Sequence, residues 1–230
     1  MHIPDGFIDA GVSAGAGVAA AGGIGVCLKK TADTLEDKQA PLAGLVAAFI
    51  FAVQMLNFPV AAGTSGHLLG GVLAAVLVGP WTGAICVALV LLVQAIFFAD
   101  GGISALGLNI VNMALIGALG GYAIFVGIRK VLPSNRTVVV AAAGIAAGMS
   151  VVLASIGFWV EYAIGGVGNA PLPTVFAAMA GTHALIGIGE GVITALTVGA
   201  VLTVRPDLVY GARDLKPSLT LGAGVQPVGR

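Results

Sequence analysis

Seven long apolar stretches, separated by short connections, constrain the fold of this chain more than any other feature. A helix needs about 20 mainly apolar residues to cross the hydrocarbon core of a bilayer. Only 9% of the 230 residues are charged, against about 25% in soluble domains, so the chain cannot build a water-soluble surface. The sequence therefore predicts an all-α integral membrane protein, a seven-transmembrane-helix bundle with helices at 11–28, 41–60, 67–78, 81–98, 106–128, 137–164 and 180–204.

The basic residues predict how this bundle is oriented. They fall into three groups, and basic residues near helix ends stay on the cytoplasmic side. A turn at Gly79-Pro80 divides the stretch 67–98, because proline disfavours helix at the residue before it. Seven crossings then put the N-terminus outside, the C-terminus in the cytoplasm and all ten basic residues on one side. Residues 1–205 would form the membrane domain and 206–230 a cytoplasmic tail. The three groups are Lys29, Lys30 and Lys38; Arg129, Lys130 and Arg136; and Arg205, Arg213, Lys216 and Arg230.

Glycines at small-xxx-small spacing predict that some of these helices pack backbone to backbone. Gly144 and Gly148 lie in the sixth stretch and Gly187 and Gly191 in the seventh. Small residues at this spacing allow close approach of membrane helices. We interpret them as packing positions within the bundle.

The opening Met1-His2-Ile3-Pro4-Asp5-Gly6-Phe7 is unusual for a membrane protein. It lacks the basic start of a cleavable signal peptide, so we expect a mature chain that begins at Met1 with a free external amine. A free amine followed by histidine is a chelator: the Met1 amine, the His2 amide nitrogen and the His2 imidazole Nδ1 supply three nitrogens in one plane. A fourth nitrogen would complete a square, the geometry that suits Ni(II) or Cu(II).

The fourth nitrogen has two candidates, since the chain has three histidines. His67 ends the small-residue segment 61–67, on the predicted outer side, and His183 lies near the predicted outer end of the last helix. A lone histidine is more often a hydrogen-bonded polar group, although ionisable groups at membrane depth are candidates for function. The residues alone leave this choice open.

Three segments together resemble the CbiM/NikM family, the substrate-binding (S) subunits of energy-coupling-factor transporters for cobalt and nickel. They are the opening heptapeptide, Gly66-His67, and the stretch from His183 to Glu190; the resemblance covers about residues 1–205. It implies a seven-helix fold in the plasma membrane, with Ni²⁺ or Co²⁺ held by Met1, His2 and His67. The implied partners are a transmembrane coupling subunit, an ATPase subunit and often a small auxiliary membrane subunit. The chain itself has no GxxxxGK[ST] phosphate loop.

Several polar residues are candidates to support the metal ligands, because a ligating imidazole usually donates its other ring nitrogen to a carboxylate, carbonyl or water. Two alternatives to the importer subunit stay open. One is a metal channel or secondary carrier without an ATPase. The other is a membrane-embedded enzyme that uses His183, Glu190 and Glu161, although no HExxH or nucleophile motif accompanies them. The candidate supporting residues are Asp5, Asn57, Thr64, Ser65, His183 and Glu190.

Overall fold

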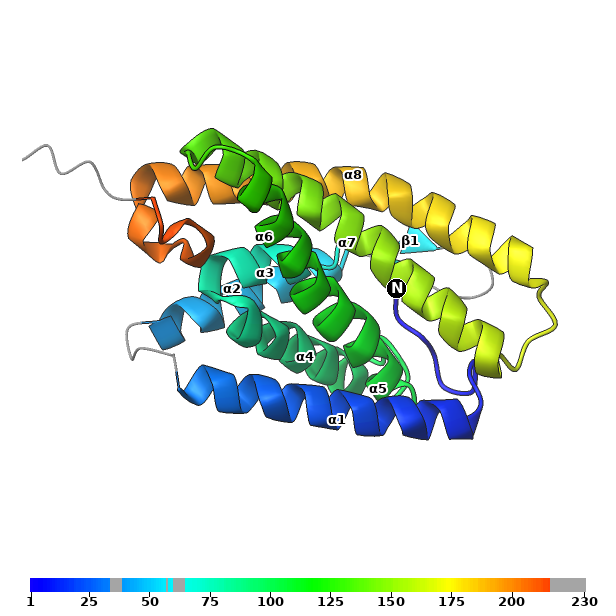
Figure 1. Cartoon of the computed structure of the whole chain (residues 1–230). Coiled ribbons are helices and arrows are strands. Elements are labelled where there is room, and N and C mark those ends of the chain that lie inside the picture. Colours follow the sequence, from blue (N-terminus) through cyan, green and yellow to red (C-terminus); the bar gives the residue numbers. More distant parts are fainter. Residues whose placement is uncertain (34–38, 57, 60–64, 216–230) are drawn as a thin grey trace, which may run out of the picture.

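The computed structural model describes residues 1–33, 39–56, 58–59 and 65–215 and is almost entirely helical (Figure 1). A two-stranded antiparallel ribbon pairs Phe58 with Gly66 and Pro59 with Ser65. The elements are α1 (Ala10–Ala32), α2 (Ala40–Gln54), β1 (Phe58–Pro59), β2 (Ser65–Gly66), α3 (Gly71–Val78), α4 (Pro80–Phe97), α5 (Leu106–Asn109), the π-helical η3 (Ile110–Gly120), α6 (Gly121–Val131), α7 (Arg136–Gly165), α8 (Leu172–Val204) and the 3₁₀ turns η4 (Pro206–Leu208) and η5 (Tyr210–Ala212).

Each of the seven apolar stretches contains helix, but only five helical segments in the described part of the chain are long and apolar enough to cross a membrane. These are α1, α4, the continuous run α5–η3–α6, α7 and α8. Helix α2 has 15 residues. Helix α3 has eight, all buried, and at 1.5 Å per residue it is too short to cross alone. The membrane-protein class is confirmed, whereas the number of crossings stays a prediction.

Three predicted boundaries were wrong. The second helix ends at Gln54 rather than at residue 60. Pro59 lies within the predicted last turn and disfavours helix at the residue before it. The third begins at Gly71 rather than His67, because Gly70 adopts a left-handed conformation (φ 74°) that interrupts the helix. The last begins at Leu172, eight residues early, since Pro173 is well placed in a first helical turn.

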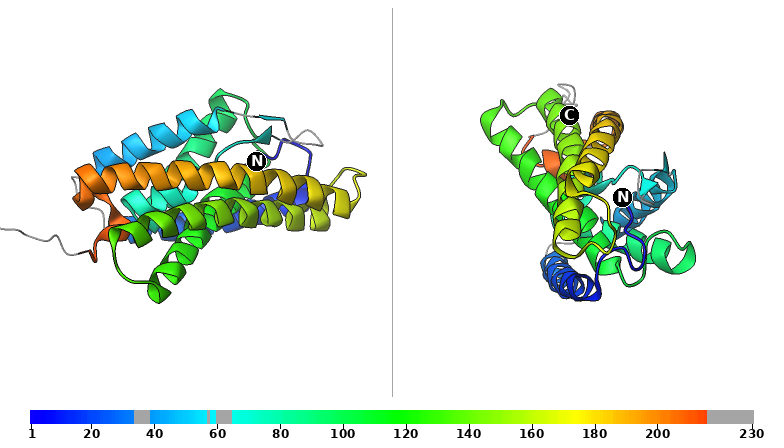
Figure 2. Two further views of the ribbon diagram at one scale, coloured as in Figure 1. Left: turned by 90° about the horizontal axis from the view of Figure 1, so that it is seen from above. Right: turned by 90° about the vertical axis from the view of Figure 1, so that its right-hand side faces the viewer.

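Helices α7 and α8 lie side by side in both views (Figures 1 and 2). At their contact, a Cβ on Gly144 would lie 2.8 Å from the Gly191 carbonyl oxygen, and one on Gly187 would lie 2.7 Å from that of Gly148. Only glycine lets these backbones approach so closely. The packing interpretation of these glycines is confirmed.

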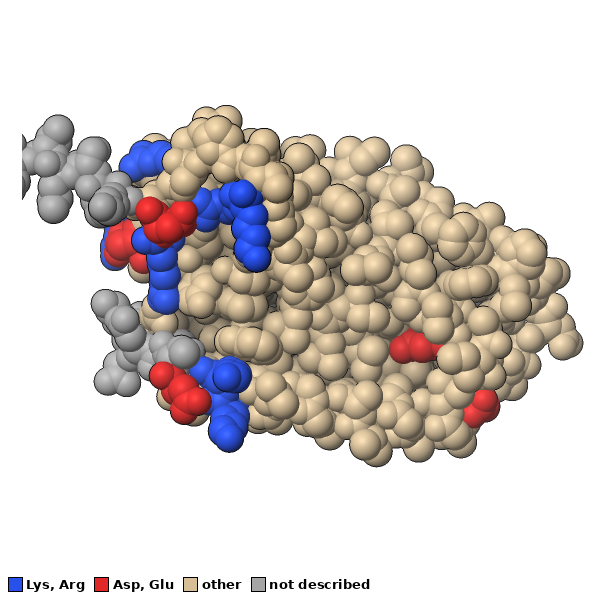
Figure 3. Space-filling view, in the orientation of Figure 1, with Lys and Arg blue, Asp and Glu red and all other residues tan. Residues whose placement is uncertain are grey.

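The described basic residues gather at one end of the molecule (Figure 3). The ends of α1, α6 and α8 and the start of α7 supply them. The first ten residues after Arg205 do not form a loose tail: Val209, Gly211 and Ala212 are buried against the bundle. The division of the chain at residue 205 stays a prediction, because residues 216–230 lie outside the described part of the chain.

Candidate metal site

An extended N-terminal arm, residues 1–9, enters the bundle from the end opposite the basic residues (Figure 2). The Ile3 N–H donates to Asn109 Oδ1 (2.8 Å), and the Ile3 carbonyl accepts from Gly102 N–H (2.8 Å) and Asn109 Nδ2 (3.3 Å). Ile3 is fully buried. The backbone just after His2 is therefore fixed by Asn109 of α5 and by the loop that follows α4.

The rest of the arm is held by further contacts. Asp5 Oδ1 accepts hydrogen bonds from the Ser104 backbone N–H (2.7 Å) and hydroxyl (2.5 Å). Phe7 packs against Phe158 and Tyr162 of α7. Asp9 caps the N-terminus of α1 through the Gly11 and Val12 N–H groups, and its own N–H donates to Gly165. Asp5 thus anchors the arm from an exposed position, and its bonds go to Ser104 rather than to an imidazole.

Met1 and His2 lie at the buried end of this arm, 1% and 4% exposed. His2 Nε2 lies 3.1 Å from Gln94 Oε1; an amide oxygen only accepts, so Nε2 carries the proton and Nδ1 keeps its lone pair. Nδ1 lies 3.0 Å from Asp100 Oδ1, and protonation of the imidazole would make this contact an ion pair. Without a proton or another cation, these two acceptors would repel each other.

The loop that carries His67 is tied to two other helices. Glu190, on α8, accepts hydrogen bonds from the Leu69 N–H (2.5 Å) and the Gly70 N–H (2.9 Å). Gln54, at the end of α2, donates to the Leu69 carbonyl (2.7 Å). Glu190 therefore supports the segment just after His67 through the two N–H groups that precede α3.

His2 and His67 stack, with ring centroids 4.4 Å apart. His67 is fully buried, and its Nδ1 lies 2.8 Å from the Leu68 carbonyl oxygen, so Nδ1 is the protonated nitrogen. Its Nε2 is buried without a hydrogen-bond partner. The site thus places two unprotonated imidazole nitrogens next to a buried chain terminus.

Burial also keeps these groups uncharged. Loss of hydration lowers the pKa of the Met1 amine to about 4, although Asp100 opposes the shift. The same cause lowers the pKa of His2 and takes that of His67 well below its usual value. At neutral pH all three therefore present lone pairs, the form that a metal ion requires.

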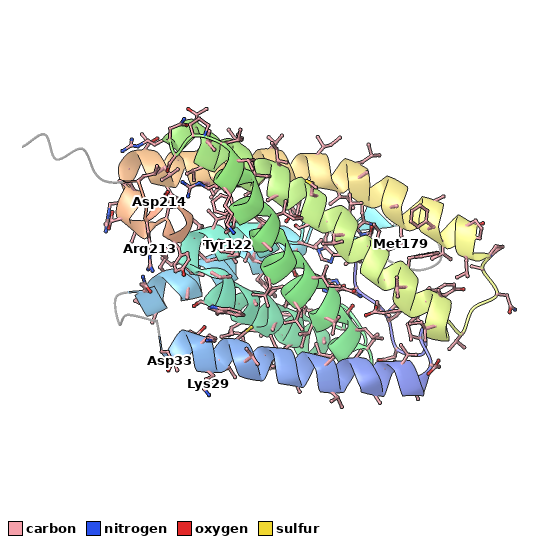
Figure 4. All side chains as sticks on the ribbon, viewed as in Figure 1. Lys29, Asp33, Tyr122, Met179, Arg213 and Asp214 are labelled. Atoms are coloured by element: carbon pink, nitrogen blue, oxygen red, sulfur yellow. The ribbon has the colours of Figure 1, made fainter. Side chains whose placement is uncertain are left out.

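His183 lies in the middle of α8 rather than at its outer end. It is fully buried, its Nδ1 bonds the Met179 carbonyl of its own helix (2.8 Å), and its Nε2 has no hydrogen-bond partner. It lies within electrostatic reach of His67 and of the Met1 amine. Figure 4 labels Met179, one turn before it.

The structure thus brings Met1, His2, His67, His183 and Glu190 to one region and leaves Asp5 at the arm's surface. Asn57 and Thr64 lie outside the described residues, and of Ser65 only the backbone is described. Among the described residues, no three His, Cys, Asp or Glu side chains form a metal-binding group. A metal held here would have to draw part of its ligand set from the backbone.

Sequence reasoning missed four residues of this site: Gln54, Gln94, Asp100 and Asn109. The first two are fully buried amides in otherwise apolar helices, and a polar residue in such a helix is itself a signal for function. Asp100 follows Ala99, which has a positive φ (52°), and such strain clusters at functional sites. No sequence pattern reveals that the arm reaches Asp100 across 98 residues of chain.

Comparison with known proteins now identifies the family. A family model described as the cobalt uptake substrate-specific transmembrane region, CbiM, matches residues 2–208. The chain belongs to the CbiM family.

Its relatives match over most of this chain. A protein of Haloquadratum walsbyi is 38% identical over 210 residues, which cover 91% of this chain and 94% of the relative. The fused nickel transport protein NikMN of Rhodobacter capsulatus is 38% identical over 93% of this chain and 65% of its own length. A crystal structure of a transition metal transporter superposes with a TM-score of 0.82 at 31% identity, covering 89% of this chain and 93% of that one.

Membership and apolar helices together make this CbiM-family chain a multi-pass membrane protein of cobalt or nickel transport.

Proposed function

We propose that this protein is the substrate-binding subunit of an ATP-driven energy-coupling-factor importer and captures Ni²⁺ or Co²⁺ at the external face of the plasma membrane. The observation that carries the proposal is the buried Met1 amine beside two imidazoles, each with an unprotonated nitrogen. Burying an imidazole nitrogen without a hydrogen-bond partner, as for His2 Nδ1 and His67 Nε2, is unfavourable. A divalent metal that accepts their lone pairs offsets that penalty.

The proposed ligands are the Met1 amine, the His2 amide nitrogen, His2 Nδ1 and His67 Nε2. The outer-sphere hydrogen bonds support this assignment, because Gln94 and the Leu68 carbonyl hold the protons of His2 and His67 on the opposite ring nitrogens. Asp100, 3.0 Å from His2 Nδ1, would balance part of the metal's charge. Four nitrogens in a plane suit Ni²⁺, while choice between Ni²⁺ and Co²⁺ depends on pocket geometry and metal supply.

The orientation follows from charge. Because basic residues favour the cytoplasmic side, the basic end of the bundle faces the cytoplasm and the arm faces outward. The ATPase, the transmembrane coupling subunit and a small auxiliary membrane subunit are then the partners that energise import, since this chain has no phosphate loop.

Two measurements test this function. The protein, purified from cells grown with both metals and with its start at Met1 verified by intact mass, should hold about one nickel or cobalt ion. His67→Ala should weaken Ni²⁺ binding at least about tenfold, or 1.4 kcal/mol, whereas Ser155→Ala, which removes a buried hydroxyl bonded within its own helix, should not.

Uptake by cells should also require an ATPase that co-purifies with the chain. Metal uptake by vesicles that contain this chain alone, driven by an ion gradient, would instead make it a secondary carrier. An unchanged Ni²⁺ affinity in His67→Ala with a large loss in His183→Ala would move the fourth ligand to His183.

A further inference from the structure

A cavity of about 390 Å³ lies at the basic end of the bundle, between α6 and the segment that follows α8. Figure 4 labels three of its lining residues, Tyr122, Arg213 and Asp214, which gather in this corner. This cavity is distinct from the candidate metal site and has no part in the proposed capture of metal. Its lining is mainly basic and aromatic, and includes Tyr122, Arg129, Lys130, Tyr210, Arg213 and Asp214.

One wall of the cavity is fixed by Arg129. Its two terminal nitrogens pair with both carboxylate oxygens of Asp214 at 2.9 Å, and one also donates to the Gly211 carbonyl (2.5 Å). Hydrogen bonding from Arg129 lowers the pKa of Asp214 to about 2. Ser134 adds a bond to the same carboxylate. Arg129 thus holds α6 against the segment that follows α8, the two elements that enclose the cavity.

The cavity keeps a positive charge after this pairing. Asp214 neutralises Arg129, which leaves Lys130 and Arg213 among the named lining residues. The Arg213 guanidinium lies over the Tyr210 ring, 4.2 Å from its centroid, a contact that orients the group without cancelling its charge. Arg129 Nε is buried and has no hydrogen-bond partner. Two positive charges and an unused donor favour an anion.

We propose that this cavity binds the phosphate headgroup of an anionic phospholipid. Basic pockets between transmembrane helices at this depth hold such headgroups, and tyrosines are enriched at the same level. Val131 and Leu132, directly after Lys130, are 79% and 46% exposed. They offer apolar surface for acyl chains beside the charged pocket, which a soluble phosphate would not use.

The experiment titrates the delipidated full-length protein, in a neutral detergent, with phosphatidylglycerol or with phosphatidylcholine of the same acyl chains. Bound lipid is counted by native mass spectrometry. The variant Lys130→Ala/Arg213→Ala removes the two unpaired charges, and Lys29→Ala/Lys30→Ala removes two charges at the same end from α1, outside the cavity lining. Retained Ni²⁺ binding verifies the fold of each variant.

We expect phosphatidylglycerol to bind more tightly than phosphatidylcholine, and the cavity variant to lose about tenfold or more of that affinity while the α1 variant keeps it. If the double variant does not fold, Lys130→Glu alone, which leaves the Arg213–Tyr210 contact in place, should also weaken phosphatidylglycerol binding. Equal affinity for both lipids, or equal loss in the α1 variant, would overturn the proposal. Competition by inorganic phosphate at equal concentration would assign the cavity to a soluble anion instead.

Discussion

Glu190 offers the sharpest test of how the bundle positions the metal site. Its carboxylate accepts the Leu69 and Gly70 N–H groups at 2.5 and 2.9 Å and so ties α8 to the loop that carries His67. Glu190→Ala leaves two donors without a partner, at about 1–3 kcal/mol each when buried. The total cost of the two unpaired donors is about 2–6 kcal/mol. If the loop moves to relieve this cost, His67 moves with it and the protein loses metal affinity.

The size of that loss has a ceiling. If Glu190 acts only through the loop, its removal cannot weaken binding more than removal of His67 itself. We therefore expect Glu190→Ala to reduce Ni²⁺ affinity about tenfold or more, up to the loss in His67→Ala. Glu190→Gln keeps one acceptor oxygen and one of the two hydrogen bonds, so its effect should be intermediate.

A double-mutant cycle by isothermal titration calorimetry measures this coupling. In the His67→Ala background, Glu190→Ala should change the Ni²⁺ affinity by no more than about 0.5 kcal/mol, the usual error of additivity. Ser155→Ala serves as a control for loss of a buried polar group. The reasoning fails if Glu190→Ala binds Ni²⁺ like the unmodified protein, or if its loss is the same in both backgrounds.

Four further predictions follow from the arm, the loops and the charges. One residue added before Met1 converts the amine into an amide, so uptake should cease while a C-terminal tag is tolerated; normal uptake with the extension retained by mass would contradict this. Gly102→Ala puts a methyl group against the Asp5 backbone nitrogen and should weaken Ni²⁺ binding, whereas Gly127→Ala, which meets no atom within 4 Å, should leave the titration unchanged. Because the folded chain lowers the pKa of the Met1 amine from 8.0 to about 4, the unfolded chain binds more protons, and the metal-free protein should lose thermal stability as pH falls from 8 toward 4; a melting temperature independent of pH over that range would refute it. A cysteine in place of Ile103 should react with an external, membrane-impermeant maleimide and one in place of Asp33 should not, and the reverse result would invert the topology.

How far the sequence predicts this structure depends on the range of the interaction involved. The membrane class, the seven apolar stretches and the α7–α8 glycine contact follow from local composition and spacing, which act within one helix or one helix pair. The shortened α2 and α3 do not. The loop between them is held by a contact distant in sequence, because Glu190, more than 100 residues away, accepts the Leu69 and Gly70 N–H groups.

The candidate site divides in the same way. Met1 and His2 were accessible to prediction because a chelating terminus is a property of two adjacent residues. Gln94 and Asp100 were not, because only the path of the arm brings His2 beside them. The supporting role predicted for Asp5 belongs to the arm's anchorage instead, since its carboxylate bonds Ser104.

X-ray absorption spectroscopy of the nickel-loaded protein, purified with a verified free Met1 amine, shows whether the chain terminus and two histidines form the metal site. We expect a square-planar shell of nitrogen donors with scattering from two imidazoles, and loss of one imidazole in His67→Ala. A six-coordinate, oxygen-rich shell that His67→Ala leaves unchanged would contradict it.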